Sequence, residues 1–275
     1  MPDKMAEQAE VAGINKVKRG FSKTFVLSIL AGAFISFGAI FATTVTAEQT
    51  LSSGFTKILG GSAFSLGLIL TIISGAELFT GNNLIVMAWA NRRIKTFQMI
   101  KNWSIVYLGN FVGAISVALL MLFSLQYSTG TGSIGAKALS IAEVKCSLEF
   151  LQALILGIFC NVLVCLAVWL CYSAKSTSGK ILSILFPITA FVAIGFEHSI
   201  ANMYFIPKAL FIKSFAADEF WTKIHSSPDI YENLSWRNFV FNNLIPVTLG
   251  NLIGGAVLVG LVYWYVYLRG NNRKD

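Results

Sequence analysis

His198 lies inside an apolar segment that is long enough to cross a membrane. An imidazole ring changes its charge near physiological pH and can donate or accept a hydrogen bond. An ionisable side chain at membrane depth is a functional candidate by default, because burying it there is costly. We therefore expect His198 to face a pore, where it hydrogen-bonds a passing anion or hands it a proton. Its surroundings are small and polar, which favours a break in the helix: Gly195-Phe196-Glu197-His198-Ser199-Ile200-Ala201-Asn202.

The same pattern occurs once before in the chain. Glycine, glutamate and asparagine recur at the same spacing in Gly75-Ala76-Glu77-Leu78-Phe79-Thr80-Gly81-Asn82. A second matching pair is Leu108-Gly109-Asn110-Phe111-Val112-Gly113 and Leu249-Gly250-Asn251-Leu252-Ile253-Gly254. The sequence thus predicts a duplicated chain with an interrupted helix in each half. Paired broken helices in a membrane protein indicate a substrate path near the middle of the bilayer.

Glu77 and Glu197 occupy matching places in the two interruptions. Their symmetry favours a scaffolding role, in which each carboxylate accepts hydrogen bonds from the N–H groups that its own break sets free. The alternative is a cation or proton site. The half-helices that follow the breaks begin with partial positive charge, so two such ends facing each other would favour an anion. Gly75, Gly195, Asn82 and Asn202 complete the predicted scaffold of the breaks.

Three further polar residues are candidates for the pore. Asn161 lies in an apolar run and needs a partner, either His198 or another helix without a role in transport. Thr80 offers a hydroxyl group in the first break, or simply a cap for the half-helix that follows. Lys145 stands at the outer mouth of a span, where position alone favours a solvated side chain that reaches the headgroups.

The composition indicates one integral membrane domain, since 55% of the 275 residues are hydrophobic and only 12% are charged. The net charge of +8 is scattered over loops and tails, which argues against a nucleic-acid partner. The four cysteines show no metal-ligand spacing, so we expect neither a metal nor another cofactor. A membrane enzyme or receptor would need a nucleophile–base pair, a metal cluster or a sizeable soluble module. We identify none in the sequence and expect a protein that is not an enzyme.

Six spans are predicted, at roughly 24–46, 58–90, 103–126, 147–172, 181–212 and 238–268. The second and fifth are too long for one straight helix and are expected to be two half-helices each. About twice as many Lys and Arg side chains fall on the side of the termini, which predicts that both termini are cytoplasmic in the inner (plasma) membrane. Three spans per half force the halves into opposite orientation, an inverted 3+3 repeat.

The expected organisation is an amphipathic cytoplasmic segment at 1–23, a six-helix channel domain at 24–268 and a cytoplasmic tail at 269–275. The N-terminal segment could fold against the cytoplasmic mouth and gate the pore, or could be a helix that lies on the membrane surface. The sequence leaves both possibilities open.

Four ordered motifs closely resemble the formate/nitrite transporter family: Ser74–Asn82, Cys160–Trp169, Gly195–Met203 and Pro246–Asn251. The resemblance runs from the first span to the last. It implies an all-α, aquaporin-like fold, assembled as a homopentamer in the lipid bilayer with one pore in each protomer. It also implies passage of small monovalent anions of weak acids: formate, nitrite, hydrosulfide, acetate or lactate.

The resemblance assigns roles to individual residues. His198 is similar to the family's central pore histidine, with Thr80 as its partner and Asn161 hydrogen-bonded to its ring. Lys145 resembles the vestibule lysine that attracts the anion. Phe64, Leu68 and Leu78 fit the outer and inner hydrophobic constrictions, with Phe191 opposing them.

Two signals within the family point to different anions. The runs Asn243–Thr248 and Tyr263–Arg269 are more similar to the formate and hydrosulfide branches, whereas Thr80-Gly81-Asn82-Asn83 leans toward hydrosulfide. Formate is the first expectation, with hydrosulfide or nitrite as alternatives and a water or neutral-solute channel as the alternative class. Because a proton from His198 would turn the anion into a neutral acid, transport is expected to rise as external pH falls.

Overall fold

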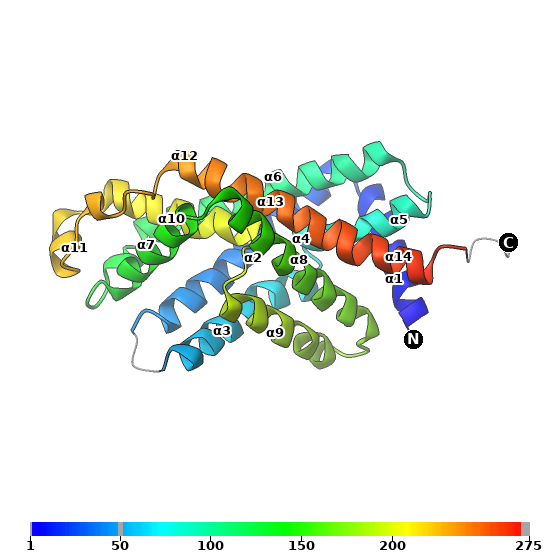
Figure 1. The fold of residues 1–275 in the computed structure, drawn as a ribbon, viewed down its shortest axis with the longest axis horizontal. Helices are drawn as coiled ribbons and strands as arrows, with labels where there is room; N and C mark the ends of the chain where they lie inside the picture. Colours follow the sequence, from blue (N-terminus) through cyan, green and yellow to red (C-terminus); the bar gives the residue numbers. More distant parts are fainter. Residues whose placement is uncertain (1, 49–51, 271–275) are drawn as a thin grey trace.

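The computed structural model describes residues 2–48 and 52–270, and this part of the chain is helices joined by turns and short loops (Figure 1). Six of its helices are long and apolar enough to cross a membrane, which confirms the predicted number of spans. They are α2 (Phe21–Val45), α3 (Ser53–Ser74), α6 (Thr96–Phe123), α8 (Phe150–Ser173), α9 (Thr177–Ile194) and the composite helix Trp236–Tyr267.

The second and fifth spans are broken at the two repeated motifs. The helix α3 ends at Gly75, and the chain resumes as α4 (Phe79–Asn82), a 3₁₀ turn at Asn83–Ile85 and α5 (Val86–Ala90). The helix α9 ends in the same way at Gly195, before α10 (Ser199–Phe215). Gly75 and Gly195 have φ angles of 73° and 89°. Glycine adopts this left-handed conformation without a steric penalty, so each glycine ends its helix.

Each half packs its membrane helices through small residues. The helix α2 lies against α3 and α6, and α8 lies against α9 and α13 (Ile245–Leu252). At corresponding places, a side chain on Gly113 would collide with the carbonyl of Ile29, and one on Gly254 with the carbonyl of Ile158. Such small residues let helix backbones approach closely in a membrane.

The last membrane helix is not a regular α-helix throughout. It consists of α12 (Trp236–Asn238), wide π-type turns at Phe239–Leu244, α13, further wide turns at Ile253–Leu261 and α14 (Val262–Tyr267). Pro246 stands just after the first wide segment and has no N–H to donate four residues back, which accounts for the irregular turns there. Asn243 lies in this segment and is fully buried.

Two helices outside the spans cover opposite ends of the molecule. The helix α1 (Pro2–Lys18) buries Met5, Ala6, Ala9 and Gly13 and packs on α5 and the adjoining 3₁₀ turn. The helix α7 (Ser133–Cys146) packs on α10. The helices α1 and α14 lie at one end of the molecule, whereas α7 and α11 (Asp218–Lys223) lie at the other end (Figure 1). Met1 and most of the predicted tail, with Arg273 and Lys274, lie outside the described residues.

Candidate functional site

A cavity of about 410 Å³ opens at the α7 end of the molecule and reaches His198. We call this cavity the vestibule. Its walls come from both halves, because α2 and α3 contribute Thr43, Lys57 and Phe64, while α7, α9 and α10 contribute Lys137, Lys145, Phe191 and Phe205, among others. The vestibule therefore lies where the two halves meet.

Three phenylalanines line the inner part of the vestibule. The ring centroids of Phe64 and Phe191 are 5.7 Å apart, and those of Phe64 and Phe205 are 6.3 Å apart. Phe191 also lies 6.0 Å from the imidazole of His198. Leu68 and Leu78 are buried in the same hydrophobic cluster but do not line this cavity. The aromatic group places an apolar surface directly beside the histidine.

His198 is buried, and both of its ring nitrogens are engaged. It precedes α10, and its Nδ1 accepts a hydrogen bond of 3.1 Å from the backbone N–H of Ala201. Its Nε2 lies 2.9 Å from Oγ1 of Thr80, which comes from the first break. Because Nδ1 accepts, the neutral ring carries its proton on Nε2 and donates it to Thr80. The two breaks thus meet at this one contact.

Asn161 does not bind His198 as expected. Its Nδ2 donates instead to Oδ1 of Asn83 and to the carbonyl of Asn251, each at 2.7 Å, with a longer contact of 3.4 Å to the carbonyl of Thr80. Two donor hydrogens are satisfied by these acceptors, so the amide ties α8 to the first broken span and to α13 rather than orienting the imidazole. The expectation of an Asn161–His198 hydrogen bond is therefore wrong for the described structure.

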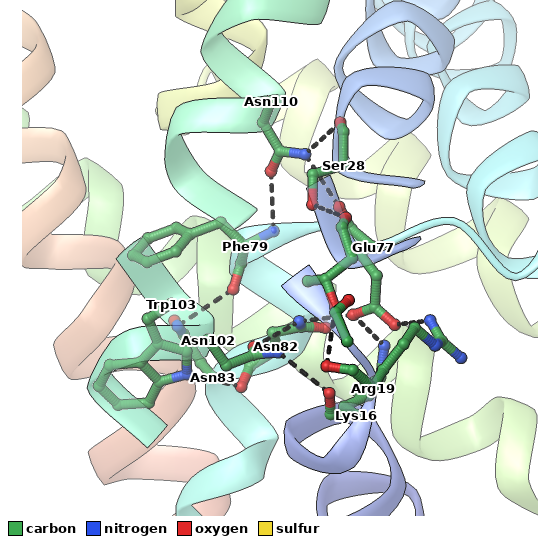
Figure 2. A network of polar contacts seen from close by, with 12 residues as sticks. Lys16, Arg19, Ser28, Glu77, Phe79, Asn82, Asn83, Asn102, Trp103 and Asn110 are labelled. Carbon is green, nitrogen blue, oxygen red and sulfur yellow. Dashed lines mark hydrogen bonds and ion pairs between the residues drawn. The ribbon is translucent and has the colours of Figure 1, made fainter. Parts of the chain in front are cut away.

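Glu77 is held by cations from the N-terminal segment (Figure 2). Its carboxylate lies 2.8 Å from Nζ of Lys16 and also pairs with Arg19, and it accepts a hydrogen bond of 2.7 Å from Nδ2 of Asn82. Asn82 is in turn bonded to Asn102 of α6 at 3.0 Å. The carboxylate therefore binds side chains, and the expectation that it caps freed backbone N–H groups is wrong.

Asn110 of α6 carries out the capping that was expected of Glu77. Its Oδ1 accepts the N–H of Phe79 at 2.9 Å, at the start of α4. Its Nδ2 donates to the carbonyls of Ser28 and Glu77 at 2.8 and 2.9 Å. Figure 2 shows this amide between α2 and the break. One side chain thus satisfies an N–H and a carbonyl group that the break would otherwise leave unpaired in the membrane, and it ties both to α2.

The second break repeats this arrangement. Glu197 pairs with Lys145 of α7 at 2.7 Å and accepts from Asn202 and Asn243 at 2.7 and 3.1 Å. Asn251 accepts the N–H of Ser199 at 2.9 Å and donates to the carbonyls of Gly157 and Glu197, as Asn110 does in the first half. Lys145 lines the vestibule, but its ammonium is already paired with a carboxylate.

The chain is similar to known proteins over nearly its whole length. Residues 3–265 match the family model "Formate/nitrite transporter". The chain belongs to the formate/nitrite transporter family. It is 48% identical to the formate channel FocA of Escherichia coli (strain K12) over 99% of this chain and 96% of that one. It is 41% identical to the formate channel FocA of Haemophilus influenzae, with 96% and 94% covered.

Solved structures of the formate/nitrite transporter family share the fold. A structure described as a pentameric formate channel with formate bound has a TM-score of 0.86 and 45% identity, covering 90% of this chain and 98% of that one. A second, described as an ion channel of the same family, has a TM-score of 0.80 and 29% identity, with 95% and 98% covered. The likeness therefore extends over most of this chain and nearly all of each solved chain.

Several residues of this formate/nitrite transporter's site were not singled out from the sequence. Phe205 follows His198 by two turns of α10, a spacing that places both on one face of a helix, so it could have been found. Asn110 and Asn251 lie in the two copies of the second repeated motif, but the motif does not indicate which backbone groups they bind. The cationic partners of Glu77 and Glu197 come from the segments that precede α2 and α8.

Proposed function

We propose that this protein is a channel, not an enzyme, for small monovalent anions of weak acids, with formate as its principal substrate. Its relatives carry the names of channels and transporters, and 48% identity to a formate channel extends over nearly the full length. The observation that carries the proposal is the vestibule that ends on His198 where the two breaks meet. The described residues form no separate soluble domain in which another function could lie.

The pathway in this proposal has three parts. Anions gather in the vestibule, pass the group formed by Phe64, Phe191 and Phe205, and meet the Nε2–H of His198. A bare anion is costly to bury against apolar side chains, so a donor placed directly beside them lowers the barrier. Leu68 and Leu78 form the apolar surface on the other side of His198 in this scheme.

The geometry favours hydrogen bonding over proton transfer at His198. An imidazole whose Nδ1 accepts the N–H of Ala201 has to lose that bond before it can take a second proton. Without the second proton, giving up Nε2–H would leave an imidazolate, which is too costly in a buried site. We therefore assign the neutral ring the role of a hydrogen-bond donor. Its Nε2–H group leaves the hydroxyl of Thr80 and donates to the passing anion instead.

The test compares formate uptake into proteoliposomes for the wild type, His198→Asn and His198→Gln. An asparagine oxygen can replace Nδ1 as the cap of Ala201 but offers nothing at the place of Nε2. A glutamine amide reaches the place of Nε2 and can donate there without ever carrying a proton. We expect His198→Asn to lower uptake by at least about tenfold, and His198→Gln to keep a measurable part of it.

The two variants separate the possible outcomes. If His198→Gln is as inactive as His198→Asn while both proteins fold as the wild type does, the donor role is wrong and proton transfer is favoured. If the wild type shows no formate uptake, the proposed substrate is wrong. Osmotic swelling of the same vesicles in neutral solutes tests the alternative of a water or neutral-solute channel.

Formate is preferred over hydrosulfide and nitrite because the residues that lean toward hydrosulfide have structural partners. Asn82 binds Glu77 and Asn102, and Asn83 binds Asn161. Neither Asn82 nor Asn83 lines the vestibule. Parallel uptake measurements with formate, nitrite and hydrosulfide test this preference, which would be overturned if hydrosulfide crossed fastest at equal anion concentration.

The relatives also support a proposal for the assembly and location. We propose a homopentamer in the inner (plasma) membrane, with one pore in each protomer and both termini in the cytoplasm. A solved relative is described as a pentameric formate channel. Large apolar side chains are exposed on the spans, where lipid or neighbouring protomers would cover them. Native mass spectrometry should give a particle of five 30.0 kDa chains.

A further inference from the structure

Lys208 and Tyr204 place two polar groups on α10 outside the vestibule. The residues are four positions apart, so their side chains lie on the same face of the helix. Lys208 is only 2% exposed and Tyr204 is 0% exposed. The ammonium Nζ of Lys208 lies 5.6 Å from the centroid of the tyrosine ring. Neither residue lines the vestibule, so the pathway proposed above does not account for them.

Both polar groups lack an adequate partner. Among the described residues, no carboxylate lies within 4.0 Å of Nζ of Lys208, and its hydrogen bond to Oε1 of Gln126 is long, at 3.5 Å. The hydroxyl of Tyr204 is buried and has no hydrogen-bond partner in the same part of the chain. Burying an ammonium without a counter-charge is costly, and a water molecule would satisfy its hydrogens but not its charge. An anion would supply both the charge and the acceptor that these donors need.

Gln126 brings a third polar group to the site from the end of α6. It begins the 3₁₀ turn Gln126–Ser128, directly after Leu125, whose φ of 56° lies in the left-handed region. Such strain costs free energy and is often found at ligand-binding positions. Nε2 of Gln126 also donates to Oγ1 of Thr44, at the end of α2, over 3.3 Å. Because both side-chain contacts are long, the amide can turn and donate to an anion beside Lys208.

We propose that Lys208, Tyr204 and Gln126 bind a small monovalent anion of the size of chloride inside the protein. The ammonium supplies the charge, and the phenol and the amide supply further hydrogen-bond donors. The buried side chains leave no place for a bulky organic anion. The bound ion stabilises the folded state and is not a transported substrate. This inference does not rest on the proposed function, because the site lies outside the vestibule.

Thermal unfolding of the purified protein tests the site. The protein is melted in sodium chloride or in sodium gluconate at equal ionic strength, because gluconate is too large for a buried site. A ligand that binds only the folded state stabilises it, so we expect chloride to raise the Tm of the wild type saturably, by at least about 3 °C. In Lys208→Met this rise should disappear. In gluconate the variant should melt above the wild type, since the buried charge then has no counter-ion.

Two further variants provide controls. Lys101→Met removes an exposed cation of α6 that does not line the vestibule, and it should keep the full response to chloride. Tyr204→Phe removes only the hydroxyl group and should raise the chloride concentration at half-saturation by at least about threefold. Equal chloride responses in the wild type and Lys208→Met would overturn the proposal, as would a wild type that does not distinguish chloride from gluconate. An unchanged half-saturation in Tyr204→Phe would overturn the role of the hydroxyl group.

Bromide locates the site directly and needs no variant that has to fold. In crystals of the wild type grown with sodium bromide, anomalous scattering should show an ion within hydrogen-bond distance of Nζ of Lys208. Bromide found only in the vestibule, or only at the surface, would overturn the proposal. None of these measurements involves transport, so a failure here leaves the proposed function intact, and a failure of formate uptake leaves this site intact.

Discussion

Lys208 of α10 is a buried cation with few partners. Its side chain is only 2% exposed, and its Nζ has one long hydrogen bond of 3.5 Å to Gln126 and lies 5.6 Å from the ring of Tyr204. No carboxylate lies within 4.0 Å of it among the described residues. The hydroxyl of Tyr204 is likewise buried and has no hydrogen-bond partner in the described part of the chain. A buried charge that is so poorly compensated destabilises the fold.

Replacing Lys208 by a neutral side chain of similar length should therefore stabilise the protein. We expect Lys208→Met to raise the free energy of unfolding by about 1–3 kcal/mol, measured by denaturant titration in mixed micelles. Tyr204→Phe is the matched variant on the same face, and it should change stability by less than about 1 kcal/mol because only an unpaired hydroxyl is lost. A loss of stability in Lys208→Met would show that the ammonium has a partner that compensates it.

Cys146, at the end of α7, should not react with thiol reagents in the folded protein. Burial raises the pKa of its thiol to about 12, so only a very small fraction is thiolate at pH 8. We expect no modification of the native protein by a maleimide at pH 8 over an hour, and rapid modification after unfolding. Mass spectrometry of the tryptic peptides checks this, and labelling of Cys146 in the folded protein would contradict the burial described for α7.

At the scale of elements, each broken span depends on an amide from the last membrane helix of its own half. Asn110 of α6 and Asn251 of the composite helix each satisfy one N–H and two carbonyl groups. Leucine has a similar size but would leave the N–H and the carbonyl group of the break without this partner, whereas the carbonyls of Ser28 and Gly157 lie inside α2 and α8. Backbone groups without partners are especially costly where water cannot replace them.

We therefore expect Asn110→Leu and Asn251→Leu each to lower the free energy of unfolding by about 3–5 kcal/mol. The control is Asn233→Ala in an exposed turn, which should cost less than about 1 kcal/mol. Denaturant titrations in the same micelles provide the comparison. A small effect of either leucine variant would mean that the break is held by other contacts.

At the scale of the molecule, the sequence predicted the spans and both breaks because their signals are local. Gly75 and Gly195 mark helix ends by their own conformation, and apolar runs reveal their length. Only the family resemblance identifies Thr80 as the partner of His198, because the two residues lie in different halves of the chain and no local pattern connects them. Asn161 was paired with the wrong group because an amide can bind many acceptors, and only the packing of α8 decides among them.

The partners of Glu77, Glu197 and Lys145 do not follow from the sequence for a related reason. A carboxylate in a break can bind two kinds of donor: the N–H groups that the break sets free, or a cationic side chain from another segment that packs beside it. The sequence did not reveal that α1 and α7 end beside the breaks, where Lys16 and Lys145 reach the carboxylates. Ion pairs between segments far apart in the chain follow from tertiary packing and leave no periodic pattern.

The contacts that close each break have a consequence for synthesis of the chain. Lys16, Arg19 and Asn110 all precede residue 124, so the ribosome has delivered every partner of Glu77 and Phe79 before the second half begins. The first half can then settle in the membrane with its backbone satisfied. The contact between Thr80 and His198 waits for the second half, and the pathway comes into being only as the halves dock. We therefore expect a nascent chain to be inserted without opening a leak.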